Sequence, residues 1–548
     1  MCQFQRAMGK LSHLPLSPFH HFATSHDPVL AQTEWCDRPT QINGLPQCLA
    51  SSDERSIIDQ YCNNRRPAPF WHSPLSPIRM SRHDVETQLV DSKPTATPLS
   101  GTREKETYQQ SDSVTRNIYI EKGSKFALRF TVYHRLSLLV ILPNAAIIIY
   151  LVVKGHVVER PEACLNAVAA NITVTVLIRQ DHIINILFTS FGLIPHWIPL
   201  CIRKHAAKLY HLGGIHSGAA IASGIWFLLF NIAVLNAQHH IRIDAQNIAS
   251  MSLCMLMDIL LLQMLVFSYP TFRTKFHDIW EQMHRFSGWL LLISFWAFMV
   301  MYNIFQAQST ATPLAQLFYY NPAFYLLSVT SISIVLPWFA LRKVQPRIDR
   351  LSSHAIRLHF DYTTVGPCRT PRFSTSPLTE WHSFASIPNF YSKGYSIIVS
   401  RAGDWTGQLI DNPPTTLWTR GFPACGVLYM AKMFRSILCV GTGSGLAPIL
   451  GLLTMSGLKF RVLWSAADPA RSFGHDVTRR ILKADPRAVI WDTRDQGRPD
   501  LVKESFRLYT EADDIEAVFV ISNPKVTSEV VFGLEKKGVP AFGPIFDS

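Results

Sequence analysis

The sequence predicts a multi-domain protein, in which a six-helix transmembrane bundle precedes an antiparallel β-barrel and an α/β domain with a parallel sheet. Six apolar segments between residues 130 and 345 are each close to the roughly 20 residues that cross a bilayer. After residue 354, short alternating runs separated by Pro and Gly are typical of a small barrel. From residue 436, strand-like runs alternate with helix-like ones, which predicts a parallel sheet.

The composition agrees with a membrane protein that carries soluble parts. Only 17% of the 548 residues are charged, with 13 Trp and 33 Phe, and the mean hydropathy is +0.11. The net charge of +13 comes largely from basic residues beside the apolar segments, so we expect no nucleic-acid partner. The ten Cys contain no C-x-x-C pair, which argues against a zinc site or a disulfide framework.

Changes in composition and hydrophobic pattern along the chain predict four regions. Residues 1–115 are rich in Pro, Ser and His without a sustained period, which indicates a disordered cytosolic tail with no secretory signal peptide. We then expect a transmembrane domain over 126–345, a barrel over 350–432 and a nucleotide-binding α/β domain over 433–548.

The orientation of the apolar segments follows from their flanking charges. The expected spans are 132–153, 167–194, 215–236, 249–269, 286–305 and 323–341. The second is the weakest, because Arg179, Asp181 and His182 interrupt it. With the N-terminus inside, twelve Lys and Arg flank the inner ends and three flank the outer ends. The chain is therefore expected to be an integral, multi-pass protein of the lipid bilayer with both termini in the cytosol.

A glycine-rich loop opens the expected α/β domain. An apolar run at 436–440 is followed by Gly441, Thr442, Gly443 and Gly445, and then by an apolar helix over about 446–453 that contains Pro448. Glycines allow the backbone to approach a phosphate closely, and a helix start offers free N–H groups. Alone, the loop fits a plain strand–turn–helix equally well. Its spacing resembles the pyridine-dinucleotide loop of the ferredoxin–NADP reductase superfamily.

A second segment extends this resemblance. Residues 380–385 read Glu-Trp-His-Ser-Phe-Ala, which is similar to the His-Pro-Phe-[Thr/Ser] flavin motif of the membrane ferric reductases and NADPH oxidases. His382 and Phe384 match that motif, whereas Ser383 replaces its proline and Ala385 its hydroxyl residue. The resemblance implies that this segment binds FAD; the alternative is a barrel strand with a half-buried aromatic pair.

Three further segments follow in the family's order. Residues 401–406 resemble its Gly-Asp-Trp-Thr element, so Arg401, Trp405 and Thr406 are implied in FAD binding, against the alternative of a polar turn. Residues 497–499 match a Gly-Arg-Pro element, which implies Arg498 near the dinucleotide. Ser522 stands where the family has the cysteine that approaches the nicotinamide. Phe546 is the terminal aromatic that would shield the flavin, or an ordinary core residue.

The whole pattern over residues 130–548 resembles fungal transmembrane flavoproteins of the TmpA type. In the related reductases two haems lie between spans 3 and 5. His216 (or His211) and His284 match the inner ligand pair, but Phe230 and Ala297 stand where the outer ligands belong. The resemblance therefore implies either one inner haem b or none, with the alternative that these are interfacial histidines. Electrons are expected to leave on the cytosolic side or in the inner leaflet.

The expected function is that of a membrane-bound flavoprotein oxidoreductase, which passes electrons from NADPH or NADH to FAD and on to an unknown small-molecule acceptor. Ser465 and Arg471 follow the second strand of the α/β domain, where the adenosine ribose or its 2′-phosphate is often bound, and they favour NADPH. Two alternatives stay open: a haem-containing ferric reductase or superoxide-producing oxidase, and a redox-inactive membrane scaffold or signalling protein.

Overall fold

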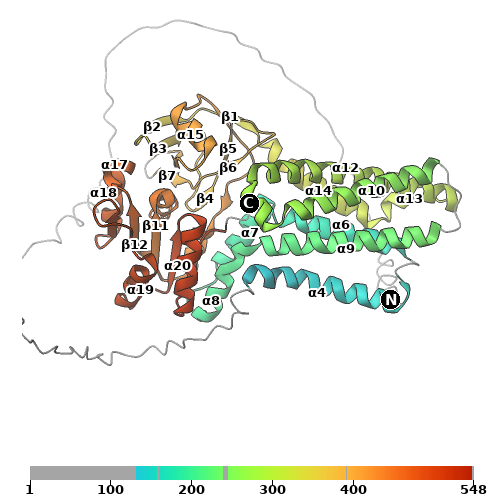
Figure 1. The fold of residues 1–548 in the computed structure, drawn as a ribbon, viewed down its shortest axis with the longest axis horizontal. Coiled ribbons are helices and arrows are strands. Elements are labelled where there is room, and N and C mark those ends of the chain that lie inside the picture. Colours follow the sequence, from blue (N-terminus) through green and yellow to red (C-terminus); the bar gives the residue numbers. More distant parts are fainter. Residues whose placement is uncertain (1–130, 157–159, 239–244, 390–391, 546–548) are drawn as a thin grey trace, which may run out of the picture. The chain divides into compact units, whose positions relative to one another are not determined.

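A computed structural model describes residues 131–156, 160–238, 245–389 and 392–545 (Figure 1). The expected tail over residues 1–115 and the candidate Phe546 lie outside these described residues.

The first half of the described chain consists of long apolar helices that run side by side (Figure 1). They are α4 (Val132–Val153), α6 (Pro161–Leu177), α9 (Gly213–Gln238), α10 (Ala245–Phe267), α12 (His277–Thr310) and α14 (Pro322–Phe339). Short helices α8 (Leu200–Ala206), η1 (Ala207–His211), α11 (Pro270–Lys275) and α13 (Leu314–Tyr319) connect them. By length and composition, five described helices can cross a membrane, and a bent pair raises that number to six.

The bent pair is α6 with α7 (Asp181–Gly192), which meet at 69°. The expected second span over 167–194 falls on this pair, which bends at the residues that interrupt the apolar pattern. The side chain of Gln180 accepts the His182 N–H and starts a new helix there. Asp181 is buried and forms a 2.7 Å ion pair with Arg372. The polar residues that interrupt the apolar pattern thus break the helix, and α7 packs on the second half of the chain.

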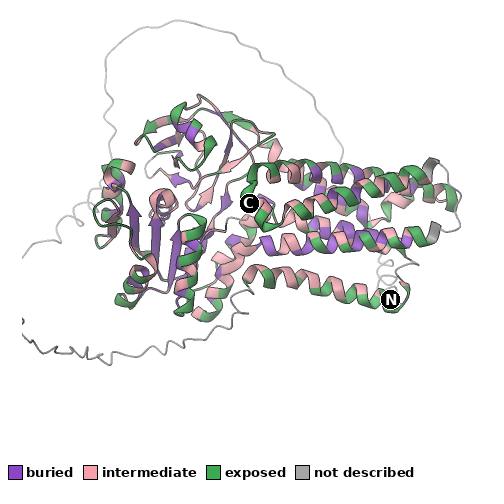
Figure 2. Ribbon diagram, viewed as in Figure 1, coloured by how far each residue is buried: buried purple, intermediate pink, exposed green. Residues whose placement is uncertain are grey.

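The interior of the bundle is largely apolar, and some of its polar groups pair with one another. Aromatic side chains, including Phe230 against Phe298 at 5.5 Å between ring centroids, fill much of it. Asn144 accepts hydrogen bonds from Asn171 at 2.9 Å and from the Trp226 indole at 2.8 Å. Such pairing stabilises the bundle because an unpaired polar group in an apolar interior is costly. Many residues on the outer faces of the helices are exposed (Figure 2). On α4 and α10 many of these exposed residues are large and hydrophobic, so both helices have apolar surfaces.

Two antiparallel sheets follow the bundle. One has the order β2-β3-β8-β7 and the other β1-β9-β5-β6. Their strands are β1 (Arg342–Val344), β2 (Arg347–Arg350), β3 (Ala355–Phe360), β5 (Arg372–Ser374), β6 (His382–Ser383), β7 (Ile387–Pro388), β8 (Tyr395–Ser400) and β9 (Leu417–Thr419). Strands β4 (Arg369–Thr370) and β10 (Ala424–Cys425) form a further pair. The expected antiparallel strands at 355–360 and 395–399 are confirmed; a closed barrel stays a prediction.

A five-stranded parallel sheet forms the C-terminal part, in the order β13-β12-β11-β14-β15. Its strands are β11 (Ser436–Thr442), β12 (Lys459–Ala466), β13 (Val489–Asp492), β14 (Ala517–Ile521) and β15 (Ala541–Phe542). All four expected strands are confirmed as parallel, and β11 and β14 are buried almost throughout (Figure 2). Helix α15 (Asp404–Asp411) precedes this sheet in the chain and packs on β8. The remaining helices are η2 (Val427–Met433), η3 (Gly443–Gly445), α16 (Leu446–Leu452), α17 (Pro469–Phe473), α18 (His475–Ala484), α19 (Leu501–Glu511) and α20 (Pro524–Lys536).

A buried ion pair connects α8 with the parallel sheet. The Arg203 guanidinium donates to both carboxylate oxygens of Glu516, at 2.7 and 3.0 Å, and to the Met433 carbonyl at 2.6 Å. The Arg435 backbone N–H also donates to Glu516. Burial would raise the pKa of the Glu516 carboxyl, but these hydrogen bonds outweigh it and hold the pKa below its ordinary value. The contact therefore stabilises the fold in proportion to the ionised fraction of Glu516.

We expect Glu516→Gln to lower the midpoint of thermal unfolding, with a loss of about 3 kcal/mol, because the buried Arg203 charge loses its partner. Glu511→Gln, which removes an exposed i,i+4 partner of Arg507, is the matched control and should cost at most about 0.5 kcal/mol. Since the folded-state pKa of Glu516 is lowered, its contribution is present above the unfolded-state pKa and is lost as the pH falls through the folded-state pKa. The gap between wild type and Glu516→Gln should therefore close in acid; an equal gap at every pH would contradict this account.

Candidate cofactor site

The glycine loop between β11 and α16 depends on close backbone packing. A Cβ on Gly445 would lie 2.1 Å from the Ile521 carbonyl oxygen, and one on Gly441 would lie 2.8 Å from the Ile449 side chain. Gly443 differs, because it has a φ of +51° and open space around it. The Trp464 indole donates to the Gly443 carbonyl at 3.0 Å and holds the turn. Two glycines therefore close the loop on the sheet, and the third leaves its outer side open.

The loop lies at the point where the strand order of the parallel sheet reverses. From β11, the chain proceeds through β12 and β13 on one side, and through β14 and β15 on the other. Ligands of open α/β sheets bind beside the carboxyl ends of the strands at such a switch point. Thr442 ends β11 and Ser522 follows β14, and their hydroxyl groups form a hydrogen bond. Ser465 is the β12 partner of Thr442 in the strand register, so three of the predicted residues meet at this edge.

The two predicted arginines of the α/β domain are exposed. Arg471 lies in α17, whose start is capped by Asp468 through the Arg471 N–H at 3.3 Å. Arg498 follows Gly497, which has a φ of +71° and accepts a hydrogen bond from the Trp491 indole. The described contacts do not join either guanidinium to the loop. Their predicted roles at the dinucleotide stay predictions.

The two segments predicted to bind FAD come together. The His382 ring stacks on Trp405 with 4.0 Å between centroids, and Phe384 stacks on the same indole at 6.0 Å. The Trp405 indole donates to the Thr375 hydroxyl at 3.2 Å. Ser383 is exposed. Strand β6 and the first turn of α15 thus present one aromatic group, although 21 or more residues separate them in the sequence.

Thr406 organises the start of α15. Its hydroxyl accepts the N–H groups of Ala402 and Gly403, at 2.9 and 3.0 Å, and donates to the Gly403 carbonyl. Arg401 forms a two-point ion pair with Asp411 at the other end of the helix, at 3.0 and 2.5 Å. The structure therefore gives Thr406 a capping role that the sequence comparison did not anticipate. Arg401 has a protein partner, and its predicted contact with FAD pyrophosphate stays a prediction.

Helix α16, which contains Pro448, connects the two predicted cofactor regions. A Cβ on Gly451 would lie 2.5 Å from the Ser386 carbonyl oxygen, so α16 passes directly over the backbone that leads into β7. The short helix η3 also packs against β8, whose end leads into α15. The glycine loop and the aromatic group around Trp405 are therefore held on neighbouring elements of one described unit.

The histidines predicted for a haem also lie together. The ring centroids of His216 and His284 are 6.2 Å apart. His216 Nδ1 lies 2.9 Å from the Thr175 carbonyl oxygen, and because a carbonyl only accepts, Nδ1 carries the proton and Nε2 the lone pair. His284 Nδ1 is buried without a hydrogen-bond partner among the described residues. His211 lies in η1, with its ring against Tyr210, outside this pair.

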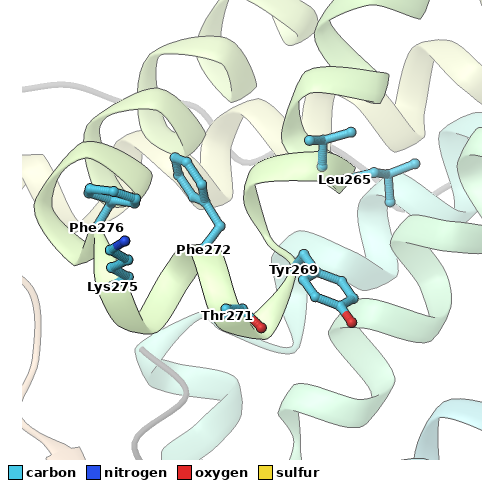
Figure 3. Close-up of a pocket in the computed structure, with 7 residues that line it drawn as sticks. Leu265, Tyr269, Thr271, Phe272, Lys275 and Phe276 are labelled. Atoms are coloured by element: carbon cyan, nitrogen blue, oxygen red, sulfur yellow. The ribbon is translucent and has the colours of Figure 1, made fainter.

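A separate apolar groove of about 630 Å³ lies near the ends of α10 and α11 (Figure 3). Its lining residues are Leu265, Val266, Tyr269, Thr271, Phe272, Lys275 and Phe276. The groove contains none of the residues that the sequence motifs single out.

Sequence reasoning missed several residues that shape the site. Ser386 is buried and donates to the Gly366 and Arg369 carbonyls, at 2.9 and 3.0 Å. The Asn185 side chain donates to the Pro423 carbonyl and accepts the Cys425 N–H. These hydrogen bonds connect α7 with the loop after β9 and with β10. The ring of His182 lies 4.2 Å from that of Phe422 in the same loop. The polar interruption in the second apolar segment, which includes His182, signalled the α7 contacts, whereas no sequence pattern signalled those of Ser386.

The chain is similar to known proteins over part of its length. Residues 427–548 match a family model described as the C-terminal domain of adenylate-forming reductase 03009. Adenylate-forming reductases 03009 and 06235 of Coprinopsis cinerea are each 41% identical, over 419 and 421 residues. These alignments cover 76% of this chain and 40% of each relative, so the chain spans two fifths of the length of the curated relatives it matches.

Among solved structures, a ferredoxin NADP+ reductase from Neisseria gonorrhoeae with bound FAD and NADP has a TM-score of 0.32 and 12% identity. The match covers 37% of this chain and 98% of that one.

Proposed function

We propose that this chain is a membrane-bound oxidoreductase that passes electrons from NAD(P)H to FAD and on to a small-molecule acceptor. One observation carries the proposal. Helix α16, which follows the glycine loop at the switch point of the parallel sheet, packs on the Ser386 backbone between β6, which bears His382, and β7. The η3 turn of the same loop packs on β8, which leads into α15 and Trp405, and Trp405 stacks on His382. A dinucleotide at the loop and a flavin at the aromatic group would then be neighbours, as direct hydride transfer requires.

The residues of this chain would bind and orient the two cofactors. Open space at Gly443 fits close approach of a pyrophosphate to the backbone. The hydroxyl groups of Thr442 and Ser522 stand at the carboxyl ends of β11 and β14, where the nicotinamide is expected. The indole of Trp405 and the ring of Phe384 offer apolar faces for an isoalloxazine ring. FAD, when bound, supplies the chemistry that accepts the hydride.

The placement in a bilayer rests on the helices and their flanking charges. Five described helices, or six with the bent pair, have the length and composition of membrane spans. The excess of Lys and Arg at one end of the spans supports cytosolic termini. NAD(P)H and the lipid bilayer are the proposed partners. The proposed activity agrees with the word reductase in the names of the two Coprinopsis relatives.

We expect the purified full chain to release FAD on denaturation, detected by fluorescence and chromatography. Trp405→Ala should lower the amount of FAD retained, because the ring would lose its stacking partner. Trp418→Ala is the matched control, since Trp418 packs under Lys343 outside the motif. Folded protein that holds no flavin, even after incubation with excess FAD, would instead support a redox-inactive scaffold.

Gly443→Val should slow reduction of the bound flavin by NADPH by roughly tenfold or more, measured by stopped flow, while FAD stays bound. A branched side chain at a φ of +51° is strained and would project into the open space beside the loop. Gly457→Val is the control, because Gly457 has a φ of +80° and open space but lies beyond α16. Equal rates in the two flavin-loaded variants would mean that the dinucleotide binds elsewhere.

A second candidate function, in which one haem b relays electrons within the bundle, is favoured by the His216–His284 pair. His216 presents Nε2 because Nδ1 binds the Thr175 carbonyl, which is the usual arrangement of a ligating histidine. The two ring centroids are 6.2 Å apart, so His216 and His284 are the two side chains that would hold a haem. A haem, when bound, supplies one-electron transfer. Phe230, in the place of an outer ligand, is buried in aromatic packing.

For this second candidate, we expect a b-type Soret band in the visible spectrum of the purified protein. His284→Ala should abolish the band and leave the FAD content unchanged. His277→Ala, on the first turn of the same helix, should leave both unchanged. A spectrum with flavin bands alone, after expression with an ample haem supply, would reject the haem.

A further inference from the structure

A second cavity, of about 400 Å³, lies where α14 leads into the antiparallel sheets. It is distinct from the aromatic group around Trp405, which lies along β6 and α15. The lining residues come from the start of β1, the 362–371 segment and the 419–423 loop: Ala340, Arg342, Tyr362, Thr363, Thr364, Val365, Gly366, Arg369, Pro371, Thr419, Arg420, Gly421, Phe422 and Pro423.

The lining is positively charged. It includes Arg342, Arg369 and Arg420, and none of the described lining residues is Asp or Glu. The nearby carboxylates have other partners, since Asp181 pairs with Arg372 and Glu281 pairs with Arg285. Three cations therefore share one cavity, and Asp181, which reaches the lining at the Phe422 N–H, is already paired with Arg372. A bound anion would offset the repulsion among these cations.

Arg420 is the clearest case. Its guanidinium packs on two perpendicular indole rings, 4.6 Å from the Trp338 centroid and 4.3 Å from that of Trp381. Its Nε is buried without a hydrogen-bond partner among the described residues. Burial, followed by the charges of Arg372 and Arg285, lowers its pKa to about 9. The Nε–H group of Arg420 therefore lacks a hydrogen-bond acceptor within the described part of the chain, which is costly for a buried donor.

The remaining lining groups suit a phosphate. Thr363, Thr364 and Thr419 contribute hydroxyl groups that can donate hydrogen bonds. Arg342 lies with its guanidinium 4.7 Å from the Tyr362 centroid, and Arg369 donates to the Pro423 carbonyl at 3.3 Å. A guanidinium group can donate two parallel hydrogen bonds to two oxygens of a phosphate. The side-chain donors that line this cavity are mostly guanidinium and hydroxyl groups. We propose that this cavity binds a phosphate group.

The phosphate can come from a phospholipid headgroup or from free phosphate. The lipid source follows from the fold, because α14 ends at Phe339, which is 82% exposed, and the next residue already lines the cavity. The proposal of a phosphate site depends only on the charges and contacts of the lining residues. The lipid source alone depends on the proposed placement in a bilayer.

The test uses the full chain in non-ionic detergent and follows the midpoint of thermal unfolding. Inorganic phosphate is titrated against chloride at matched ionic strength, and dihexanoyl phosphatidate against dihexanoyl phosphatidylcholine. Arg342→Gln should raise the phosphate concentration needed for half of the shift by about tenfold, through loss of a charged hydrogen-bond donor. Lys343→Gln removes the same charge one residue along, from a side chain that packs on Trp418 outside the cavity, and should behave as wild type.

A shift with both ligands supports the site with free phosphate as a sufficient source. A shift with phosphatidate alone supports it with a lipid source. No shift with either ligand, or equal weakening by Arg342→Gln and Lys343→Gln, overturns the proposal. Loss of FAD from Arg342→Gln without a change in the phosphate response also overturns it, because the cavity would then belong to the flavin site. Failure of the flavin proposal, in contrast, leaves the phosphate response of wild type intact.

Discussion

The close passage of α16 between two backbones is the constraint on which the arrangement of the C-terminal half depends. At its start, Gly445 lies against the Ile521 carbonyl of the parallel sheet, and near its end Gly451 lies against the Ser386 carbonyl of the antiparallel part. Any side chain at either position would collide with a main-chain atom that cannot rotate away. This pair of contacts fixes α16, and the candidate dinucleotide loop before it, against the backbone that leads from β6 into β7.

Strong local periodicity explains what the sequence predicted well. The four expected strands of the parallel sheet and the apolar helices are long, regular patterns, and their type is confirmed. β15, with two residues, carries too little pattern to be recognised. The short strands of the antiparallel sheets were harder for the same reason, because strands such as β6 and β7 each contain two residues. Their positions are set by tertiary packing rather than by local preference.

The candidate site was predictable as a set of segments but not as a set of contacts. The motif spacing led to Thr442 and Ser522, which do meet. It gave no indication that Arg401 would pair with Asp411, or that Thr406 would cap α15. Both contacts lie within residues 401–411, so they depend on where α15 begins and ends. Likewise, Asp181 looked like a weakness in a membrane span, whereas its burial against Arg372 joins the bundle to the sheets.

The short length of α6 has a consequence for the bilayer itself. Its 17 residues extend about 25 Å, whereas the hydrocarbon layer is roughly 30 Å thick. In the proposed membrane placement, the polar turn that follows α6 therefore begins below the level of the surrounding headgroups. The loop with Gly421 and Phe422, which contacts Asp181 and His182 there, enters that depth with it. In that placement, the cytosolic boundary of the membrane would be indented at this point, and protein would replace lipid over the last few ångströms.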